Sequence, residues 1–222
     1  EFFFYTMEFV KGRTLREWMA RKKRFGLGST VRVLSLLCYA LEHAHRFTVH
    51  RDLSPENVMV TPAGEVKLLD FGLAKLLDTQ ASFTRIGVSL GKQHYSAPEQ
   101  RMDAKNADHR ADLFSLGVLF YEMLSGKTPV PDVPLTDLAP DLPQECDTFV
   151  DKAIHPKPDA RFQSAAEMRH ALNHVYRIAQ MSPEDVKAER ARSNLDRQRK
   201  DDRGWRMILI PIRFARELLS RR

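Results

Sequence analysis

The stretch VHRDLSPENVMV, residues 49–60, decides the fold, because it places polar side chains where neither a helix nor a plain strand can continue. Asp52 and Asn57 stand five positions apart, and Pro55 between them prevents a helix from running through. Two short apolar strands, VMV and EVKLL, flank residues 61–64 (TPAG), whose proline and glycine are typical of a turn. The sequence therefore predicts a polar loop that runs directly into a β-hairpin.

The hairpin is expected to bring two polar residues together. If its turn is centred between Ala63 and Gly64, Asn57 and Asp70 face each other across the antiparallel pair. An amide oxygen and a carboxylate then converge, and such hard oxygen ligands suit Mg²⁺, which takes the rest of its shell from water and substrate phosphates. Asp52 can point into the same space and accept a proton from an incoming hydroxyl, which indicates a phosphoryl-transfer site.

The rest of residues 1–178 predicts a mainly helical body. A strand is expected at residues 2–10, and helices at 15–25, 29–44, 112–126 and 164–179. Ser29 is the expected N-cap of the second helix, and the third is apolar nearly all round, as in a fully buried helix. Residues 78–96 are rich in Ser, Thr and Gly, which indicates a long functional loop. These elements predict an α+β fold with a small hairpin.

Charge and composition narrow the function classes. With 222 residues, 43% of them apolar, the chain can form one core plus an appendage. Residues 177–222 hold 13 Lys and Arg against 7 Asp and Glu, whereas residues 1–176 hold 22 of each, so the body is not expected to bind nucleic acid. The two cysteines show no metal-ligand or disulfide pattern, which favours a cytoplasmic protein. No apolar run reaches the ~18 to 20 residues of a spanning helix.

The basic tail, residues 179–222, is expected to be a separate segment. Residues 183–202 predict either an exposed charged helix or a disordered linker. In residues 204–222, three apolar side chains share one helical face and three arginines lie elsewhere; the apolar ones are Phe214, Leu218 and Leu219, and the arginines are Arg213, Arg216 and Arg221. Such a segment can rest on an anionic membrane surface, and it can equally dock on the body or on a partner.

Three motifs in chain order resemble the signature set of the eukaryotic-type protein kinases. They are HRDL at residues 50–53 with Asn57, DFG at residues 70–72, and APE at residues 97–99. The sequences of three segments are most similar to those of the bacterial Ser/Thr kinases; they are SPENVMV, YSAPEQ and LFYEMLSGKTP. The resemblance covers residues 1–178 and implies the hinge and large lobe of a protein-kinase-like fold. It also implies transfer of the γ-phosphoryl group of ATP, with Mg²⁺, to a Ser or Thr hydroxyl of a protein substrate.

The resemblance implies chemical roles for matching residues. Asp52 corresponds to the catalytic base, and Asn57 and Asp70 correspond to the Mg²⁺ ligands. Met7 corresponds to the gatekeeper of the ATP pocket, and the backbone of the hinge residues hydrogen-bonds adenine. The residues implied to line this pocket are Met7, Glu8, Val10, Met59 and Leu69.

Other matching residues are implied to regulate or support the site. Arg51 would clamp a phosphorylated residue of the long loop, since a phosphate adds about −1.5 to −2 charge. The candidates for phosphorylation are Ser82, Thr84 and Ser89, and Phe71 corresponds to a packing switch. Four residues are implied to be structural: His50 beneath Phe71, Glu99 paired with Arg161, and Asp112 at the start of the buried helix that anchors the catalytic loop.

Two residues depart together from the family's pattern. Ser54 stands where Ser/Thr kinases carry a lysine that neutralises the transferring phosphate, and Lys92 stands where they carry a threonine. We hypothesise that Lys92, on its flexible stem, reaches Asp52 or the phosphate from the other side and joins the catalytic residues. The alternative is a catalytically impaired pseudokinase that acts as a protein-binding scaffold. Both changes also leave the preference for Ser/Thr or Tyr open.

The motifs of the kinase N-lobe do not occur in these residues. The sequence contains no G-x-G-x-x-G loop and no V-A-I-K lysine, and it starts at the implied hinge without a Met. We therefore expect the sequence to lack its natural beginning and the N-lobe. Because phosphate cradling comes from that lobe, this polypeptide alone is expected to be a poor enzyme.

Overall fold

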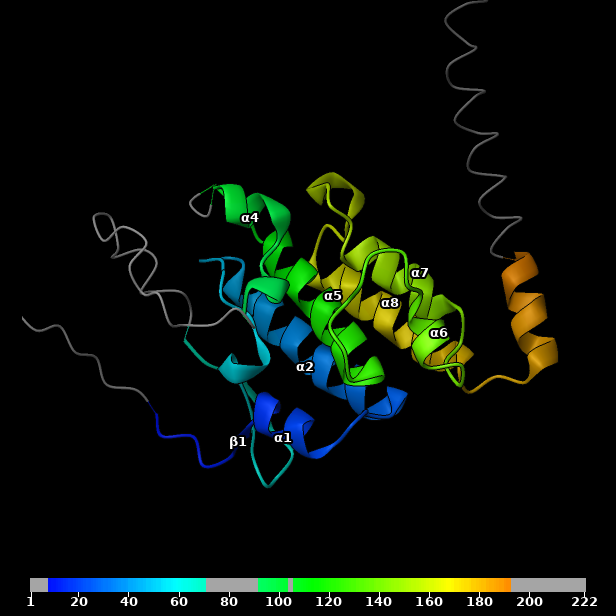
Figure 1. The fold of residues 1–222 in the computed structure, drawn as a ribbon, viewed down its shortest axis with the longest axis horizontal. Helices are drawn as coiled ribbons and strands as arrows, with labels where there is room; N and C mark the ends of the chain where they lie inside the picture. Colours follow the sequence, from blue (N-terminus) through cyan, green and yellow to red (C-terminus); the bar gives the residue numbers. More distant parts are fainter. Residues whose placement is uncertain (1–7, 71–91, 104–105, 193–222) are drawn as a thin grey trace, which may run out of the picture. The chain divides into compact units, whose positions relative to one another are not determined.

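The computed structural model describes residues 8–70, 92–103 and 106–192 (Figure 1). The chain divides into two compact units, Glu1–Ala179 and Gln180–Arg222. The first unit is mainly helical with one small sheet, which confirms the predicted α+β class. Its elements in chain order are β1 (Arg13–Thr14), α1 (Leu15–Arg21), α2 (Leu27–Ala44), η1 (Pro55–Asn57), β2 (Val58–Val60), β3 (Val66–Leu68), η2 (Lys92–Tyr95), α4 (Pro98–Met102), α5 (Arg110–Ser125), α6 (Leu135–Leu138), α7 (Glu145–Ala153), η3 (Pro158–Ala160) and α8 (Ala165–Ile178).

Helix α5 lies at the centre of the core. Every residue from Ala111 to Ser125 is buried, as the continuous apolar run predicts. The helix ends at Gly126, whose φ of 75° is left-handed and whose Cβ, if present, would lie 2.3 Å from the Lys23 carbonyl oxygen. Helices α2 and α7 pack against α5, and α8 packs against α2 and α7 (Figure 1). Each fully buried Leu of this core contributes about 1.5–3 kcal/mol through the hydrophobic effect.

The sheet is antiparallel, in the order β1-β2-β3, and its hairpin differs in register from the prediction. Val58 pairs with Leu68 and Val60 with Val66, so Asn57 faces Leu69 rather than Asp70. The cause is the turn, in which the Thr61 amide donates to the Glu65 carbonyl and three residues, 62–64, form the loop. Gly64 provides the left-handed residue that a three-residue turn requires, with φ of 80°. An odd loop length shifts the register by one residue.

Several predicted element bounds are wrong, among them the start of the buried helix, which begins at Arg110 rather than at residue 112. Helix α2 begins at Leu27 with Gly26 as its N-cap, so Ser29 lies inside the helix, because Leu27 already packs against the core. Helix α1 ends at Arg21, because Lys22 is extended and the chain then turns to hydrogen-bond α5, where the Phe25 amide donates to the Met123 carbonyl. Of the strand expected at residues 2–10, residues 8–10 are not in a strand and residues 1–7 lie outside the described residues.

The sequence did not predict strand β1, which forms where residues 13–14 pair with β2. Arg13 pairs with Val60 and Thr14 with Met59, which extends the hairpin to three strands. Gly12 allows this approach, because a Cβ there would lie 2.7 Å from the Val60 carbonyl oxygen. Thr14 also caps α1 in a capping box with Glu17, so that the strand leads directly into the helix.

The described part of the second unit is residues 180–192. Residues 183–192 are helical, and Ser182 caps them by accepting a hydrogen bond from the Asp185 amide at 3.2 Å. Residues 183–202 were expected to form either an exposed charged helix or a disordered linker, and the described part, residues 183–192, is a helix. Residues 193–222, including the amphipathic segment 204–222, lie outside the described residues. Within residues 8–70, 92–103 and 106–192, no helix has both the length and the apolar character needed to span a bilayer.

Candidate active site

Asp112 joins the polar loop of residues 50–57 to the core. Its buried carboxylate, in the first turn of α5, accepts hydrogen bonds from the His50 amide at 2.9 Å and from the Arg51 amide at 2.8 Å. His45 Nε2 lies 2.9 Å from the same carboxylate. A carboxylate near a helix N-terminus also interacts favourably with the helix dipole. The loop backbone is therefore fixed to α5, which is buried from Ala111 to Ser125.

Arg51 has a left-handed backbone conformation, with φ of 62°. A non-glycine residue in this region costs on the order of 1–3 kcal/mol and persists only where its surroundings hold it. Besides Asp112, the Gln100 side-chain amide donates to the Arg51 carbonyl, and Arg51 Nη2 donates to the Ala107 carbonyl at 3.3 Å. Backbone strain held from several sides often marks a functional site.

His50 links the loop to the end of the hairpin. Its Nδ1 accepts a hydrogen bond from the Asp52 amide at 3.2 Å, and its Nε2 lies 2.8 Å from the Leu69 carbonyl oxygen. Because a carbonyl only accepts, Nε2 must carry the proton. The imidazole thereby ties residue 52 to the residue that precedes Asp70, a structural use of the ring. Phe71, beneath which His50 was expected to pack, lies outside the described residues.

Asp52 and Asn57 are in direct contact. The Asn57 amide nitrogen, Nδ2, donates to the Asp52 carbonyl at 2.6 Å and to Asp52 Oδ2 at 3.0 Å. The turn η1 sets this spacing, since Pro55 occupies its first position and the Asn57 backbone amide donates to the Ser54 carbonyl at 2.9 Å. With Nδ2 used in these two bonds, the amide oxygen of Asn57 is the atom that can serve as a ligand.

Asp70 lies close to Asn57 although the two are not cross-strand partners. The Leu69 amide donates to the Asn57 carbonyl at 2.8 Å, and Asp70 follows as an exposed residue with a left-handed φ of 48°. An amide oxygen and a carboxylate are hard donors, so the two residues fit Mg²⁺ chemically. In the described ranges, no three His, Cys, Asp or Glu side chains gather as a metal cage.

Lys92 brings a positive charge to Asp52. Its Nζ lies 3.3 Å from Asp52 Oδ2, and the two side chains are 30% and 33% exposed. Ser54, two residues after Asp52, is only 2% exposed. The cation beside the carboxylate therefore comes from η2, 40 residues further along the chain.

Sequence reasoning missed a cluster around Arg16. Its guanidinium donates to Glu56 and Glu122 at 2.8 Å each and to the Tyr95 hydroxyl at 2.9 Å, and that hydroxyl in turn donates to Glu122. Burial alone would lower the pKa of Arg16, but its hydrogen bonds to Glu122 and Glu56 raise it. We call these four residues the Arg16 clamp. It joins α1, η1, η2 and α5.

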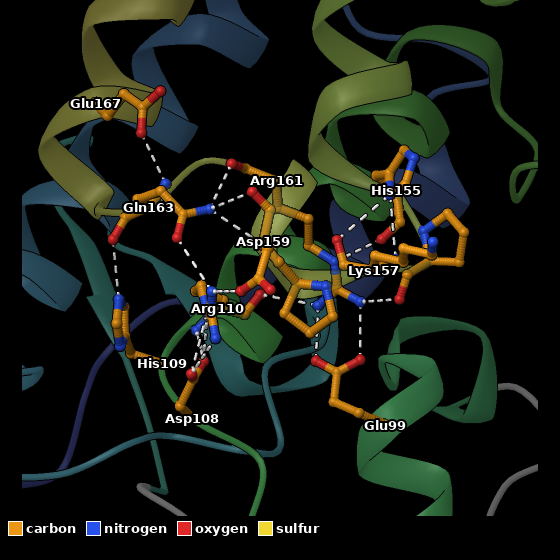
Figure 2. Close-up of polar contacts among 12 residues, drawn as sticks. Glu99, Asp108, His109, Arg110, His155, Lys157, Asp159, Arg161, Gln163 and Glu167 are labelled. Carbon is orange, nitrogen blue, oxygen red and sulfur yellow. Dashed lines mark hydrogen bonds and ion pairs between the residues drawn. The ribbon is translucent and has the colours of Figure 1, made fainter. Parts of the chain in front are cut away.

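The implied pair of Glu99 and Arg161 is present (Figure 2). Arg161 Nη1 and Nη2 each donate to one Glu99 carboxylate oxygen at 2.7 Å, and the arginine side chain is completely buried. The same guanidinium donates to the carbonyls of His155, Pro156 and Arg110. Burial would raise the pKa of Glu99, but the hydrogen bonds from Arg161 lower it. The pair fastens α4 to the segment before α8.

The remaining predicted residues are only partly described. Glu8 is exposed and accepts from Lys67 Nζ at 2.5 Å, while Val10, Met59 and Leu69 are half-buried. Met59 on β2 and Leu69 after β3 belong to the hairpin beside Asn57. The other predicted residues, Met7, Phe71, Ser82, Thr84 and Ser89, lie outside the described residues.

The sequence of this chain is similar to those of known protein kinases. Residues 1–177 match the family model described as the protein kinase domain. The chain is 36% identical over 186 residues to the serine/threonine-protein kinase Pkn1 of Myxococcus xanthus, covering 75% of this chain and 26% of that protein. It is also 36% identical over 198 residues to the tyrosine-protein kinase MasK of the same species, covering 77% of this chain and 30% of that protein.

A solved structure is similar over most of the first unit. The kinase domain of Mycobacterium tuberculosis PknI has a TM-score of 0.61 and 28% sequence identity, over 76% of this chain and 64% of that chain. The chain spans less than a third of the length of the two curated relatives.

Proposed function

The chain belongs to the protein kinase domain family, and on that premise we propose that the protein transfers the γ-phosphoryl group of ATP to a Ser or Thr hydroxyl of a protein substrate. The observation that carries the proposal is the contact of Asn57 Nδ2 with Asp52, on a loop whose backbone Asp112 holds. This arrangement presents a carboxylate and an amide oxygen at one place, and Asp70 follows Leu69, whose amide donates to the Asn57 carbonyl.

Each residue has a distinct role in the proposed reaction. Asp52 accepts the proton of the substrate hydroxyl, and Asn57 orients it through the hydrogen bond at 3.0 Å. The Asn57 amide oxygen and the Asp70 carboxylate would hold Mg²⁺, which when bound supplies positive charge next to the phosphates. The backbone of Glu8 and Val10 would bind adenine, with Met59 and Leu69 against the ring.

The preference for Ser or Thr belongs to the proposal. Pkn1 is named a serine/threonine-protein kinase and MasK a tyrosine-protein kinase, and the chain is 36% identical to both. Phosphoamino-acid analysis of the labelled product decides between these hydroxyls.

The test is phosphate transfer from labelled ATP by the full-length protein in the presence of Mg²⁺, with Asp52→Asn alongside. We expect transfer by the wild type and a loss of at least about 10²-fold in the variant, the size typical of a general base. Asp137→Asn is the matched control, because this exposed carboxylate lies on α6 away from the site. Equal rates for wild type and Asp52→Asn would refute the assignment of the base.

A second candidate function is that of a pseudokinase that binds partners without catalysis. The uncharged Ser54, buried two residues after Asp52, favours it. Binding of ATP separates the two functions, because a ligand that binds only the native state raises its melting temperature. A rise with ATP that requires Mg²⁺ supports the enzyme, and no rise together with no transfer supports the scaffold.

A further inference from the structure

In the candidate active site the ammonium group of Lys92 lies beside Asp52, whereas residue 54 is an uncharged serine. Phosphoryl transfer develops negative charge that a kinase must stabilise with fixed positive groups. Ser54 cannot supply such a charge, since its side chain is a hydroxyl. Lys92 Nζ, in contrast, lies 3.3 Å from Oδ2 of the proposed base Asp52.

The turn that carries Lys92 is firmly attached to the core. Tyr95, at the end of η2, is 2% exposed, and its carbonyl accepts from the Ser115 hydroxyl of α5 at 2.7 Å. Its own hydroxyl donates to Glu122 and accepts from Arg16, both in the Arg16 clamp. The backbone three residues before Tyr95 is therefore held at a defined position on α5.

The same clamp holds the opposite side of the site. Arg16 Nε donates to Glu56, which immediately precedes Asn57 on η1, at 2.8 Å. One guanidinium thus contacts both the loop that carries Asp52 and the turn that carries Lys92. The ammonium itself stands on a flexible four-carbon stem and is 30% exposed, so it can move from Asp52 to an incoming phosphate without being stripped of water.

We propose that Lys92 is a catalytic residue that supplies, from η2, the positive charge beside the transferring phosphoryl group, with the Arg16 clamp setting its position. This inference rests on the proposed kinase function. In the step, a bond forms between the substrate hydroxyl oxygen and the γ-phosphorus, and the bond from that phosphorus to the ADP oxygen breaks. The hydroxyl proton passes to Asp52. Lys92 keeps its proton and neutralises charge on the phosphoryl oxygens.

The first test moves the charge between the two positions in the full-length protein. Lys92→Thr is expected to lower kcat by about 10²–10³-fold, the cost of one preorganised electrostatic group. The exchange S54K/K92T is expected to recover activity to within about tenfold of the wild type, which is about 1.4 kcal/mol in the barrier. Lys127→Thr, on an exposed lysine beyond α5, is the matched control and should leave kcat unchanged.

A second test restores the ammonium at its original position, because a lysine at the buried position 54 can fail to fit. The variant Lys92→Cys is treated with 2-bromoethylamine, which converts the cysteine into a close analogue of lysine. Cys38 and Cys146 are buried, and burial raises the pKa of each thiol to about 12, so they react slowly. Treatment should raise the activity of the variant at least tenfold and leave that of the treated wild type unchanged.

The outcomes separate this inference from the proposed function. Activity of Lys92→Thr within threefold of the wild type, while Asp52→Asn is inactive, would overturn the role of Lys92 and leave the kinase function standing. Loss in Lys92→Thr with recovery in neither the exchange nor the alkylated variant, all folded by circular dichroism, would also overturn it. If the wild type itself transfers no phosphate, the proposed function fails first and the inference fails with it.

Discussion

Replacing Arg161 by methionine tests how much the buried ion pair stabilises the fold. The change removes two hydrogen bonds to Glu99 and leaves three carbonyls without their donor. Removing one partner of a buried pair costs about 3–5 kcal/mol, because the other charge stays in the protein without compensation. For a protein of 150–250 residues each kcal/mol lowers the melting temperature by about 2–4 °C, so the expected decrease is about 6–20 °C.

Urea unfolding followed by circular dichroism measures this loss. The double variant E99Q/R161M should lose less than the sum of its single variants, because it leaves no unpaired carboxylate. The control is Asp141→Asn, which removes an ion pair between Arg24 and the Asp141 carboxylate. The Asp141 side chain is 72% exposed, so this change should cost less than about 1 kcal/mol. A cost for Arg161→Met as small as that of the control would refute the reasoning.

Three further results are expected. The pKa of Glu99 is lowered in the folded protein, so its contribution to the free energy of unfolding is present above the ordinary pKa of about 4.5 and is lost as the pH falls through the lower folded value. The difference in unfolding free energy between wild type and Glu99→Gln should therefore shrink when unfolding is measured at acid pH. Gly117→Ala should cost about 1–3 kcal/mol in urea unfolding, since its new Cβ would lie 2.6 Å from the Ala153 Cβ on α7; a neutral result would show that α5 and α7 can separate. Arg16→Met should cost about 3 kcal/mol, because it leaves the Glu122 carboxylate, which is 11% exposed, without its cation; a change below 1 kcal/mol would make the Arg16 clamp an ordinary surface contact.

Local patterns in the sequence predict much of the fold. The run from residue 112 to 126 is apolar nearly all round, and a helix of this kind is expected to be buried on all its faces at the centre of the core. The hairpin follows from two short strand-like segments, VMV and EVKLL, around a turn that contains a proline and a glycine. The motif residues 50, 52 and 57 are close in sequence, so their proximity in space is almost assured, and the structure adds the contact distances.

What the sequence does not predict depends on loop length and on distant contacts. Whether a turn holds two or three residues follows from the backbone of Gly64, which the presence of a glycine alone does not reveal. The Arg16 clamp joins residues 40 to 106 positions apart, and no periodicity records such a contact. Its only signal was indirect: Glu122 is a glutamate in a run of residues that is otherwise mostly apolar. The 3.3 Å contact of Lys92 with Asp52 is of the same kind and could be hypothesised only because Ser54 lacked a charge.

The attachment of His50 and Arg51 to Asp112 has a consequence for the timing of motions in the site. The amide hydrogens of these two loop residues end on a carboxylate that belongs to the buried helix α5. Exchange of these amide hydrogens with solvent requires their hydrogen bonds to Asp112 to break. Because Asp112 is buried on α5, we expect this to happen only when the core opens. This loop is therefore expected to open only together with the core, so that the residues of the candidate active site are already in place when a ligand arrives.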